Sequence, residues 1–360
     1  MILAFTACAL TINAQEAPKS QEDKTTIEIP QWIKDIKLSG YGMVQYQAED
    51  KKDAEHNEFN LRLVRLALDG KISDFQYKVQ IQINGNTSSL GSSPRLVDLW
   101  TEWQKYDFLR IKAGQFKRSF TLENPMHPIT QGFFSYAQAI TKLAGMSDRT
   151  GEHASNGRDI GIQLQGDFLK NANNRNLLHY QIGVFNGEGI NKKDADNRKD
   201  IIGGFWVMPV KGMRIGAFGW TGSRVISYTD PDTKVAYTRS VPKNRYALSA
   251  DYVTESDWTF RTEYVHSQGY SANLADGDKA DAYYALCIAP VIKKKMHVKA
   301  RYDLYRPTKE WSTSKTYYEI GADYLISKNV QINLEYARVN DRTATKHNYN
   351  MVDVQLDFRF

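Results

Sequence analysis

The chain has 360 residues, of which 41% are hydrophobic and 24% charged, and its formal net charge is +6 at pH 7. This balance is typical of a folded protein and excludes a disordered chain. Beyond the opening residues no apolar run approaches the ~18 residues of a membrane-spanning helix, and the mean hydropathy is -0.54, so a helical membrane protein is also excluded.

The chain opens with MILAFTACALTINAQ, a short apolar stretch followed by small and polar residues. This pattern is typical of a secretory signal, and we expect residues 1–14 to be removed after Ala14. A buried terminal strand is the alternative. Removal of the signal would leave Cys287 as the only cysteine, so the mature chain would have no intramolecular disulfide. It would keep the basic pI of about 9.0, which favours anionic partners.

Strict alternation of apolar and polar side chains recurs along the chain, most clearly in residues 74–84 and in the last nine residues, VDVQLDFRF. Because strand side chains point to opposite faces with a period of two, each such segment predicts a strand with one apolar and one polar face. Two strands are irregular: 201–208 is apolar on both faces, and in 58–70 the apolar face changes near Arg65, which a β-bulge would explain. Sixteen strands are predicted, near residues 38–47, 58–70, 74–84, 96–105, 108–116, 158–168, 177–186, 199–208, 212–221, 244–254, 257–267, 281–291, 295–305, 316–326, 329–339 and 349–360.

The connections between these strands alternate between short and long. Residues 70–74 and 327–329 are tight turns, while 186–199, 222–244 and 268–280 are long polar loops. Short turns on one rim and long loops on the other are typical of an antiparallel transmembrane β-barrel. Because a bilayer offers no hydrogen-bond partner to an open sheet edge, the strands must close into a ring, with apolar faces toward lipid and polar faces toward a water-filled lumen.

The predicted fold is therefore all-β: a transmembrane antiparallel β-barrel of about 16 strands in the outer membrane. It occupies residues 38–360, and residues 15–37 form a periplasmic N-terminal segment. The long connection 117–157 contains Phe133, Ile140 and Leu143 around a possible short helix, so it has apolar surface to bury. We expect this third loop to fold into the lumen and narrow it, with an external lid or a contact between subunits as the alternative.

Three stretches carry a resemblance to a known family: LRLVRLALDGKISDFQYKVQIQING at 61–85, LRIKAGQFKRSFTLEN at 109–124 and NGRDIGIQLQGDF at 156–168. They resemble the phosphate-selective porin O and P family, and the likeness extends from about Leu38 to Phe360. The resemblance implies a 16-stranded outer-membrane porin, typically a homotrimer, whose third loop folds inward and whose basic residues line a path for small anions such as phosphate. The terminal Phe360 resembles the signal that such barrels present to their assembly machinery.

Carried over residue by residue, the resemblance implies an anion path. Guanidinium groups suit phosphate because their planar fork donates two hydrogen bonds and stays charged. Several sites, none too tight, let an ion enter and leave. Carboxylates also occur on the predicted lumen faces, so a charge-paired wall with weak selectivity stays open as an alternative. The path residues are Arg62, Arg65, Lys117, Arg118, Arg149 and Arg158. The strand cations that we expect to form wall salt bridges are Lys78, Arg110, Lys112, Arg245, Arg261, Lys299 and Arg301.

Other function classes have weaker support. The seven histidines show no metal-ligand spacing such as HExxH, and no GxSxG accompanies them, so catalysis is not expected. No cofactor is implied. The cations alternate along strands instead of forming one basic stripe, which argues against nucleic-acid binding. A general, weakly selective porin for small polar solutes and a structural barrel with a plugged lumen are the alternatives that the sequence leaves open.

Overall fold

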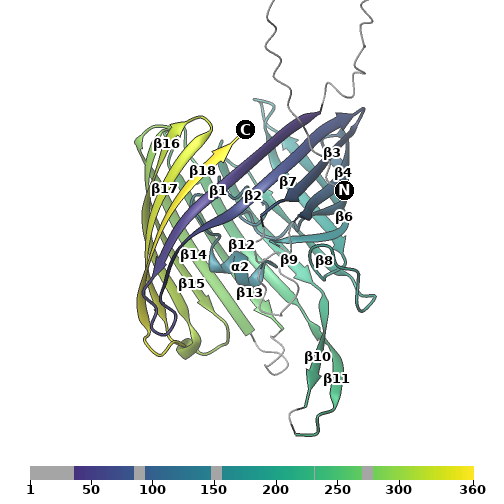
Figure 1. Ribbon diagram of the computed structural model, residues 1–360. Coiled ribbons are helices and arrows are strands. Elements are labelled where there is room, and N and C mark those ends of the chain that lie inside the picture. The colour runs from purple at the N-terminus through teal and green to yellow at the C-terminus, as the bar shows by residue number, and fades with distance from the viewer. Residues whose placement is uncertain (1–35, 85–93, 147–155, 231, 270–278) are drawn as a thin grey trace, which may run out of the picture.

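The computed structural model describes residues 36–84, 94–146, 156–230, 232–269 and 279–360. In these ranges sixteen strands form one closed antiparallel barrel, in which each strand pairs with its neighbours and β1 pairs with β18 (Figure 1). All sixteen predicted strands are confirmed, and their ends differ from the predicted ones by a few residues. The barrel strands are β1 (Lys37–Glu49), β2 (His56–Ile72), β3 (Phe75–Gln82), β4 (Arg95–Tyr106), β5 (Leu109–Lys117), β6 (Arg158–Lys170), β7 (Asn176–Phe185), β8 (Asp200–Val207), β9 (Met213–Thr221), β12 (Asn244–Val253), β13 (Thr259–Gln268), β14 (Lys279–Ile292), β15 (Met296–Arg306), β16 (Lys315–Ser327), β17 (Val330–Asp341) and β18 (Asn348–Arg359).

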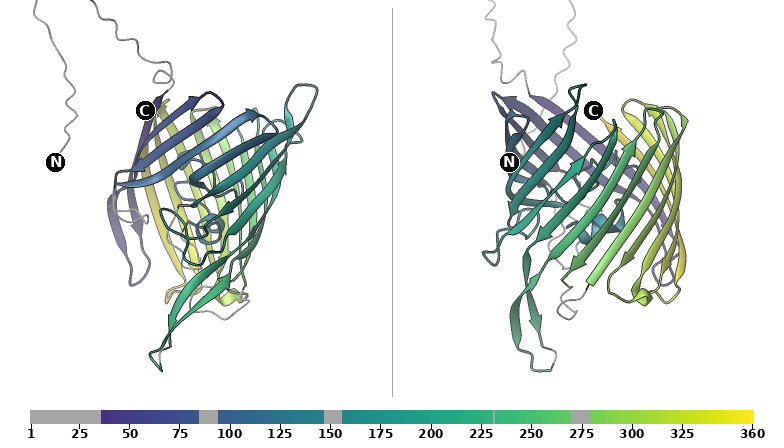
Figure 2. Two further views of the ribbon diagram at one scale, coloured as in Figure 1. Left: turned by 90° about the vertical axis from the view of Figure 1, so that its right-hand side faces the viewer. Right: turned by 180° about the vertical axis from the view of Figure 1, so that it is seen from behind.

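A two-stranded hairpin stands outside the ring. β10 (Ser223–Thr229) and β11 (Ala236–Pro242) pair only with each other and interrupt the sequence between β9 and β12. The hairpin extends beyond the rim that is opposite the C-terminus (Figure 2). The sequence predicted residues 222–244 to be one long loop. The two strands of the hairpin lie within that range and are only seven residues long each. No helix in the described ranges is long and apolar enough to cross a membrane.

The alternation of the strands matches the two faces of the barrel wall. On β18, Leu356 and Phe358 are exposed on the outside, whereas Asp353 and Asp357 are buried inside the ring. The bulge predicted near Arg65 is present, because the pairing of β1 with β2 shifts register between Met43 and Val44. A bilayer covers the exposed apolar side chains of the outer face, because contact of this apolar surface with water would be unfavourable.

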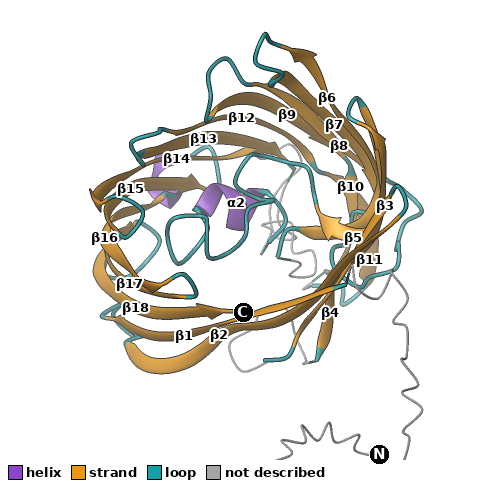
Figure 3. Ribbon diagram, turned by 90° about the horizontal axis from the view of Figure 1, so that it is seen from above, coloured by secondary structure: helices purple, strands orange, loops and turns teal. Residues whose placement is uncertain are grey.

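Part of the inner face is apolar, which corrects the expectation of a polar lumen throughout. Phe185, Ile202 and Tyr284 point inward and are fully buried in one core cluster. The loop between β5 and β6 fills this space, because its short helix α2 (Gln138–Leu143) lies against β13, β14 and β15. Figure 3 shows α2 inside the ring. The inward Ile202 therefore explains why β8 is apolar on both faces.

Candidate functional site

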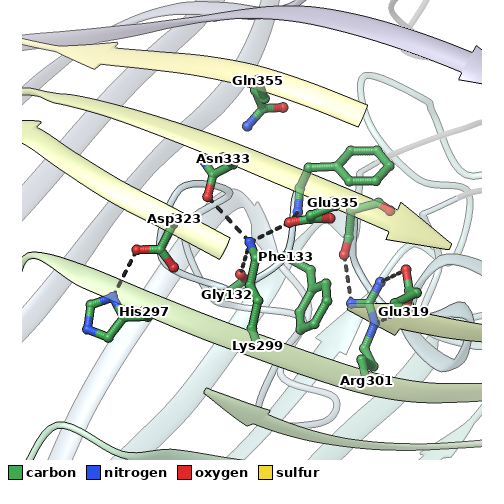
Figure 4. Close-up of polar contacts among 12 residues, drawn as sticks. Gly132, Phe133, His297, Lys299, Arg301, Glu319, Asp323, Asn333, Glu335 and Gln355 are labelled. Atoms are coloured by element: carbon green, nitrogen blue, oxygen red, sulfur yellow. Dashed lines mark hydrogen bonds and ion pairs between the residues drawn. The ribbon is translucent and has the colours of Figure 1, made fainter. Parts of the chain in front are cut away.

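The described part of the third loop, residues 118–146 and 156–157, is fixed to the wall by its backbone. Four wall cations donate to carbonyl oxygens of the loop over 2.8–2.9 Å: Arg245 to Leu143, Arg261 to Gln131, Lys299 to Gly132 and Arg301 to Ser135. Three wall carboxylates accept from loop amides over 2.6–2.9 Å: Glu263 from Leu122, Asp303 from Gln138 and Glu335 from Phe134. Figure 4 shows Lys299, Arg301 and their partners. These cations therefore hold the loop, and several also form the predicted wall ion pairs, such as Arg301 with Glu319.

The same loop contacts the opposite wall. The ring of His127 packs edge-on against Tyr41 of β1, with their centroids 4.6 Å apart. Ile129 packs against the small cluster that contains Tyr41. The Phe134 ring lies 5.5 Å from the guanidinium carbon of Arg62 on β2. Since residues 127–135 contact both β1–β2 and β15–β17, this segment crosses the lumen and divides it.

A cavity of about 250 Å³ lies between the loop and the wall of β1–β7. Charge dominates its lining, where five cationic side chains face a single carboxylate, that of Asp98. We call it the basic cavity, and its cations are Arg65, Lys78, Lys112, Lys117 and Arg158. A second cavity of about 410 Å³, at the rim that holds Lys37 and Phe360, shares Arg65 and Lys78 with it. The two cavities therefore adjoin and form a basic path toward the end with the C-terminus.

Arg65 is the residue of the basic cavity with the clearest unused hydrogen-bonding capacity. Its side chain is 1% exposed and donates to Gln82 over 3.1 Å and to the hydroxyl of Tyr41 over 3.0 Å. Its Nη2 is buried and has no hydrogen-bond partner among the described residues. No carboxylate within the described ranges forms an ion pair with Arg65. A buried guanidinium nitrogen without an acceptor is costly, so an anion or water in the cavity would complete it.

Lys117 is the second cation of the cavity with no carboxylate partner among the residues that the structure describes. Its Nζ donates to the carbonyl oxygen of Met126 over 2.6 Å and to the hydroxyl of Tyr136 over 2.7 Å. Burial lowers the pKa of nearby His127 from 6.5 to about 4, and the positive charges of Lys117 and Arg65 act in the same direction. The two cations therefore add to the effect of burial and disfavour the protonated form of the His127 ring.

The remaining residues of the predicted path take different positions. Arg118 is 0% exposed and pairs with Asp159 over 2.8 Å, so it stabilises the loop base and does not face the lumen. Arg158 lines the basic cavity but binds Asp98 through two nitrogens, over 2.7 and 3.0 Å. Arg62 sits beside the register shift, which turns it inward, and donates to Gln355 over 3.2 Å. Arg149 lies outside the described residues.

On the other side of the loop, a cavity of about 470 Å³ adjoins β15–β18. Its lining mixes three cations with four carboxylates: Lys142, Arg301 and Lys315 with Asp303, Glu319, Asp341 and Asp353. The lumen therefore has a basic side and a side of mixed charge, and the loop separates them.

Sequence reasoning missed the aromatic partners of the cations. Tyr41 and Tyr136 accept hydrogen bonds from Arg65 and Lys117, and the Trp100 ring lies 3.7 Å from the Nζ of Lys112. The abundance of tyrosine was visible, with 21 copies, but it also fits the membrane interfaces of a barrel. Nothing in the alternation separates a lumen tyrosine from an interfacial one.

Comparison with known proteins agrees with this architecture. Residues 39–185 match the family model described as phosphate-selective porin O and P. No curated protein matches the chain. Among solved structures, an anion-selective porin from Comamonas acidovorans is 14% identical, with a TM-score of 0.64 and coverage of 90% of this chain and 99% of that chain. OmpF of Salmonella typhi, solved with daunomycin, is 13% identical, with a TM-score of 0.64 and coverage of 90% and 97%.

Because the sequence identity of these structural neighbours is low, they establish only the fold. The family match adds the protein class. OprB of Pseudomonas putida gives the same result at 9% identity, with a TM-score of 0.64 and coverage of 91% of this chain and 95% of that chain. The family and the fold are those of channels. Residues 39–185 match the model of the phosphate-selective porin O and P family, and the closed barrel around them has the fold of an outer-membrane porin.

Proposed function

We propose that this outer-membrane channel lets small anions, phosphate among them, diffuse passively through the basic side of its lumen. One observation carries the proposal: among the described residues, the lining of the basic cavity has five cationic side chains and one carboxylate, and the buried Nη2 of Arg65 has no partner. The proposed path consists of Arg65, Lys117 and Arg158, with Arg62 at the loop and the untested Arg149. We leave Arg118 out, because its guanidinium is fully buried against Asp159.

The mechanism requires only that side chains replace part of the ion's hydration shell. Arg65 offers an N–H without a partner in the described ranges, and Lys117 offers an ammonium group that can exchange the Tyr136 hydroxyl for a phosphate oxygen. Asp98 already neutralises Arg158, so the pair contributes a dipole to the path and little net charge. Several partial sites of moderate strength favour entry and still permit release. The Comamonas neighbour is described as anion-selective, which supports a barrel of this shape in that role.

Current through the purified protein in a planar bilayer tests the proposal. Under a potassium chloride gradient, we expect a reversal potential on the anion side, and added phosphate should block the chloride current. A reversal potential near zero or on the cation side, without phosphate block, would contradict it. The absence of any current would favour a plugged barrel.

A weakly selective channel for small polar solutes is the second candidate. The mixed lining of the 470 Å³ cavity favours it, because three cations and four carboxylates nearly cancel there. Such a channel would conduct potassium and chloride about equally, and phosphate would reduce the current only through its lower mobility. The same bilayer measurement separates the two candidates.

Three further proposals concern the N-terminal segment, the assembly of the channel and the last residue of the chain. We propose that residues 1–14 are a cleaved signal and that 15–37 lie in the periplasm; all of these except 36 and 37 fall outside the described residues. We also propose a homotrimer and recognition of Phe360 by the barrel assembly machinery. Mass spectrometry of the mature chain, native electrophoresis and deletion of Phe360 test these points in turn.

A further inference from the structure

We infer that Lys299 and Glu335, on the wall opposite the basic cavity, are positioning residues for anion selectivity. They hold residues 132–136 of the third loop, which we call the strap, and the strap supplies the aromatic groups that contact the proposed path. This inference rests on the proposed function and adds residues to it that never touch the transported ion.

Lys299 donates a hydrogen bond to the strap backbone, and Glu335 accepts one from it. The Nζ of Lys299 donates to the carbonyl oxygen of Gly132 over 2.8 Å and forms an ion pair with Glu335. Glu335 Oε1 accepts from the backbone amide of Phe134 over 2.9 Å. The pair therefore fixes the backbone on either side of Phe133, whose ring lies 5.0 Å from the Lys299 Nζ (Figure 4). We call this arrangement the clamp.

The opposite side of the strap faces the proposed path. The ring of Phe134 lies 5.5 Å from the guanidinium carbon of Arg62, and the hydroxyl of Tyr136 accepts from Lys117 over 2.7 Å. Each contact engages a cation that has no carboxylate partner in the described part of the chain. A shift of the strap would change which donors Arg62 and Lys117 leave free for an ion. The clamp therefore sets the path's geometry from the far wall.

Lys299 does not itself serve as an ion ligand in this arrangement. Its side chain is 0% exposed and that of Glu335 is 4% exposed, so a passing anion cannot reach the pair. The strap backbone needs such a grip, because Gly132 has a φ of +106° and the segment belongs to no helix or strand. The other anchors of the strap backbone are the bond from Arg301 to the carbonyl oxygen of Ser135 and the bonds from the Gln131 side chain to the carbonyl oxygens of Phe133 and Phe134.

The double variant Lys299→Met/Glu335→Gln tests the inference in the full-length channel. It removes one positive and one negative charge, so the net charge of the lumen stays the same and any change in selectivity must come from geometry. Lys299→Arg keeps a donor for Gly132 and should restore wild-type behaviour. Arg306→Met/Asp281→Asn is the matched control, because Arg306 on the same strand binds Asp281 through two nitrogens and forms no hydrogen bond or ion pair with the described residues of the loop.

Single-channel chloride conductance, open-channel noise and phosphate block are measured for each variant. For the double variant we expect greater noise and a phosphate block weakened by about two- to thirtyfold, the range of coupling between distant sites. Lys299→Arg and Arg306→Met/Asp281→Asn should match the wild type. Wild-type conductance, noise and block in the double variant would overturn the inference. Heat-modifiable gel mobility identifies folded barrels, and Lys299→Gln/Glu335→Gln, which removes the same two charges but keeps polar side chains at both positions, replaces the double variant if that variant does not fold.

The two proposals can fail separately. If the wild-type channel shows neither an anion-side reversal potential nor phosphate block, the proposed function fails, and chloride conductance and noise alone decide the role of the clamp. If the wild type is blocked by phosphate and the double variant is blocked equally, only the clamp fails.

Discussion

Replacement of Arg65 by methionine is the sharpest test of the basic cavity. Methionine keeps most of the side-chain volume and removes the charge together with the unpartnered Nη2. It also removes the donors to Gln82 and Tyr41, which are neutral groups, and the Tyr41 side chain lines both cavities. No carboxylate in the described ranges pairs with Arg65, so the change leaves no buried charge uncompensated. The barrel should therefore fold, and the effect should fall on ion binding.

The expected size follows from Coulomb's law. Two unit charges about 4 Å apart interact by about 1 kcal/mol in water and about 4 kcal/mol at an effective dielectric constant of ~20. The cavity of about 250 Å³ contains water but is bounded by protein, so its value lies toward the lower limit. We expect Arg65→Met to weaken phosphate block by about 1 to 2 kcal/mol, or about 5- to 30-fold at low salt. Screening should reduce the effect in molar salt.

The assay is phosphate block of the chloride current in a planar bilayer, at low and at high ionic strength. Arg306→Met removes an arginine that is paired with Asp281 outside the basic cavity, so it should leave the block unchanged. If phosphate blocks the current through Arg65→Met and Arg306→Met as strongly as through the wild type at low salt, Arg65 does not bind the ion. An effect of equal size at low and high salt would show that the loss is not electrostatic.

Three further predictions follow from individual contacts. Lys117→Met should raise the pKa of His127 from about 4 toward 6.5, because removal of a nearby positive charge favours the protonated ring; an NMR titration of labelled histidine that shows no shift would exclude a positive field at this point. Arg118→Met should lower the stability to denaturant by about 3 to 5 kcal/mol, since it removes the guanidinium group that forms an ion pair with the buried carboxylate of Asp159, while phosphate block in the folded fraction stays unchanged. Gly114→Ala should reduce the folding yield in gel-shift assays, because a Cβ at its φ of +127° would meet a carbonyl oxygen of β4 at 2.2 Å; a normal yield would show that β4 and β5 can adjust.

The sequence determined the barrel with little help from tertiary context. In VDVQLDFRF and in residues 74–84, each side chain is assigned to lipid or lumen by parity alone, and the structure places Leu356 outside and Asp357 inside accordingly. The short turns and long loops then gave the direction of the strands. A membrane strand leaves few alternatives, because its backbone must pair on both sides and its outer face must be apolar. The hairpin β10–β11 escaped prediction because it lies beyond the bilayer, where neither constraint applies.

The candidate site was less accessible to sequence reasoning. Arg118 and Arg65 are both basic residues next to family motifs, yet one is buried against a carboxylate and the other faces the cavity with a free N–H. Asp159, which makes the difference, is 41 residues from Arg118 in the sequence. Whether a cation is neutralised depends on which carboxylate the closed ring brings within about 4 Å, and parity along a strand does not contain that information.

The position of the third loop against the barrel wall was decided by the tertiary structure alone. Its length and apolar residues predicted burial, but the partners lie far along the chain: Lys299 is 167 residues from Gly132, and Glu335 is 201 residues from Phe134. Alternation tells only that Lys299 and Glu335 point inward. Which inward groups meet the loop depends on the curvature of the closed ring and on the volume that remains inside it, and these are properties of the assembled barrel and not of any one strand.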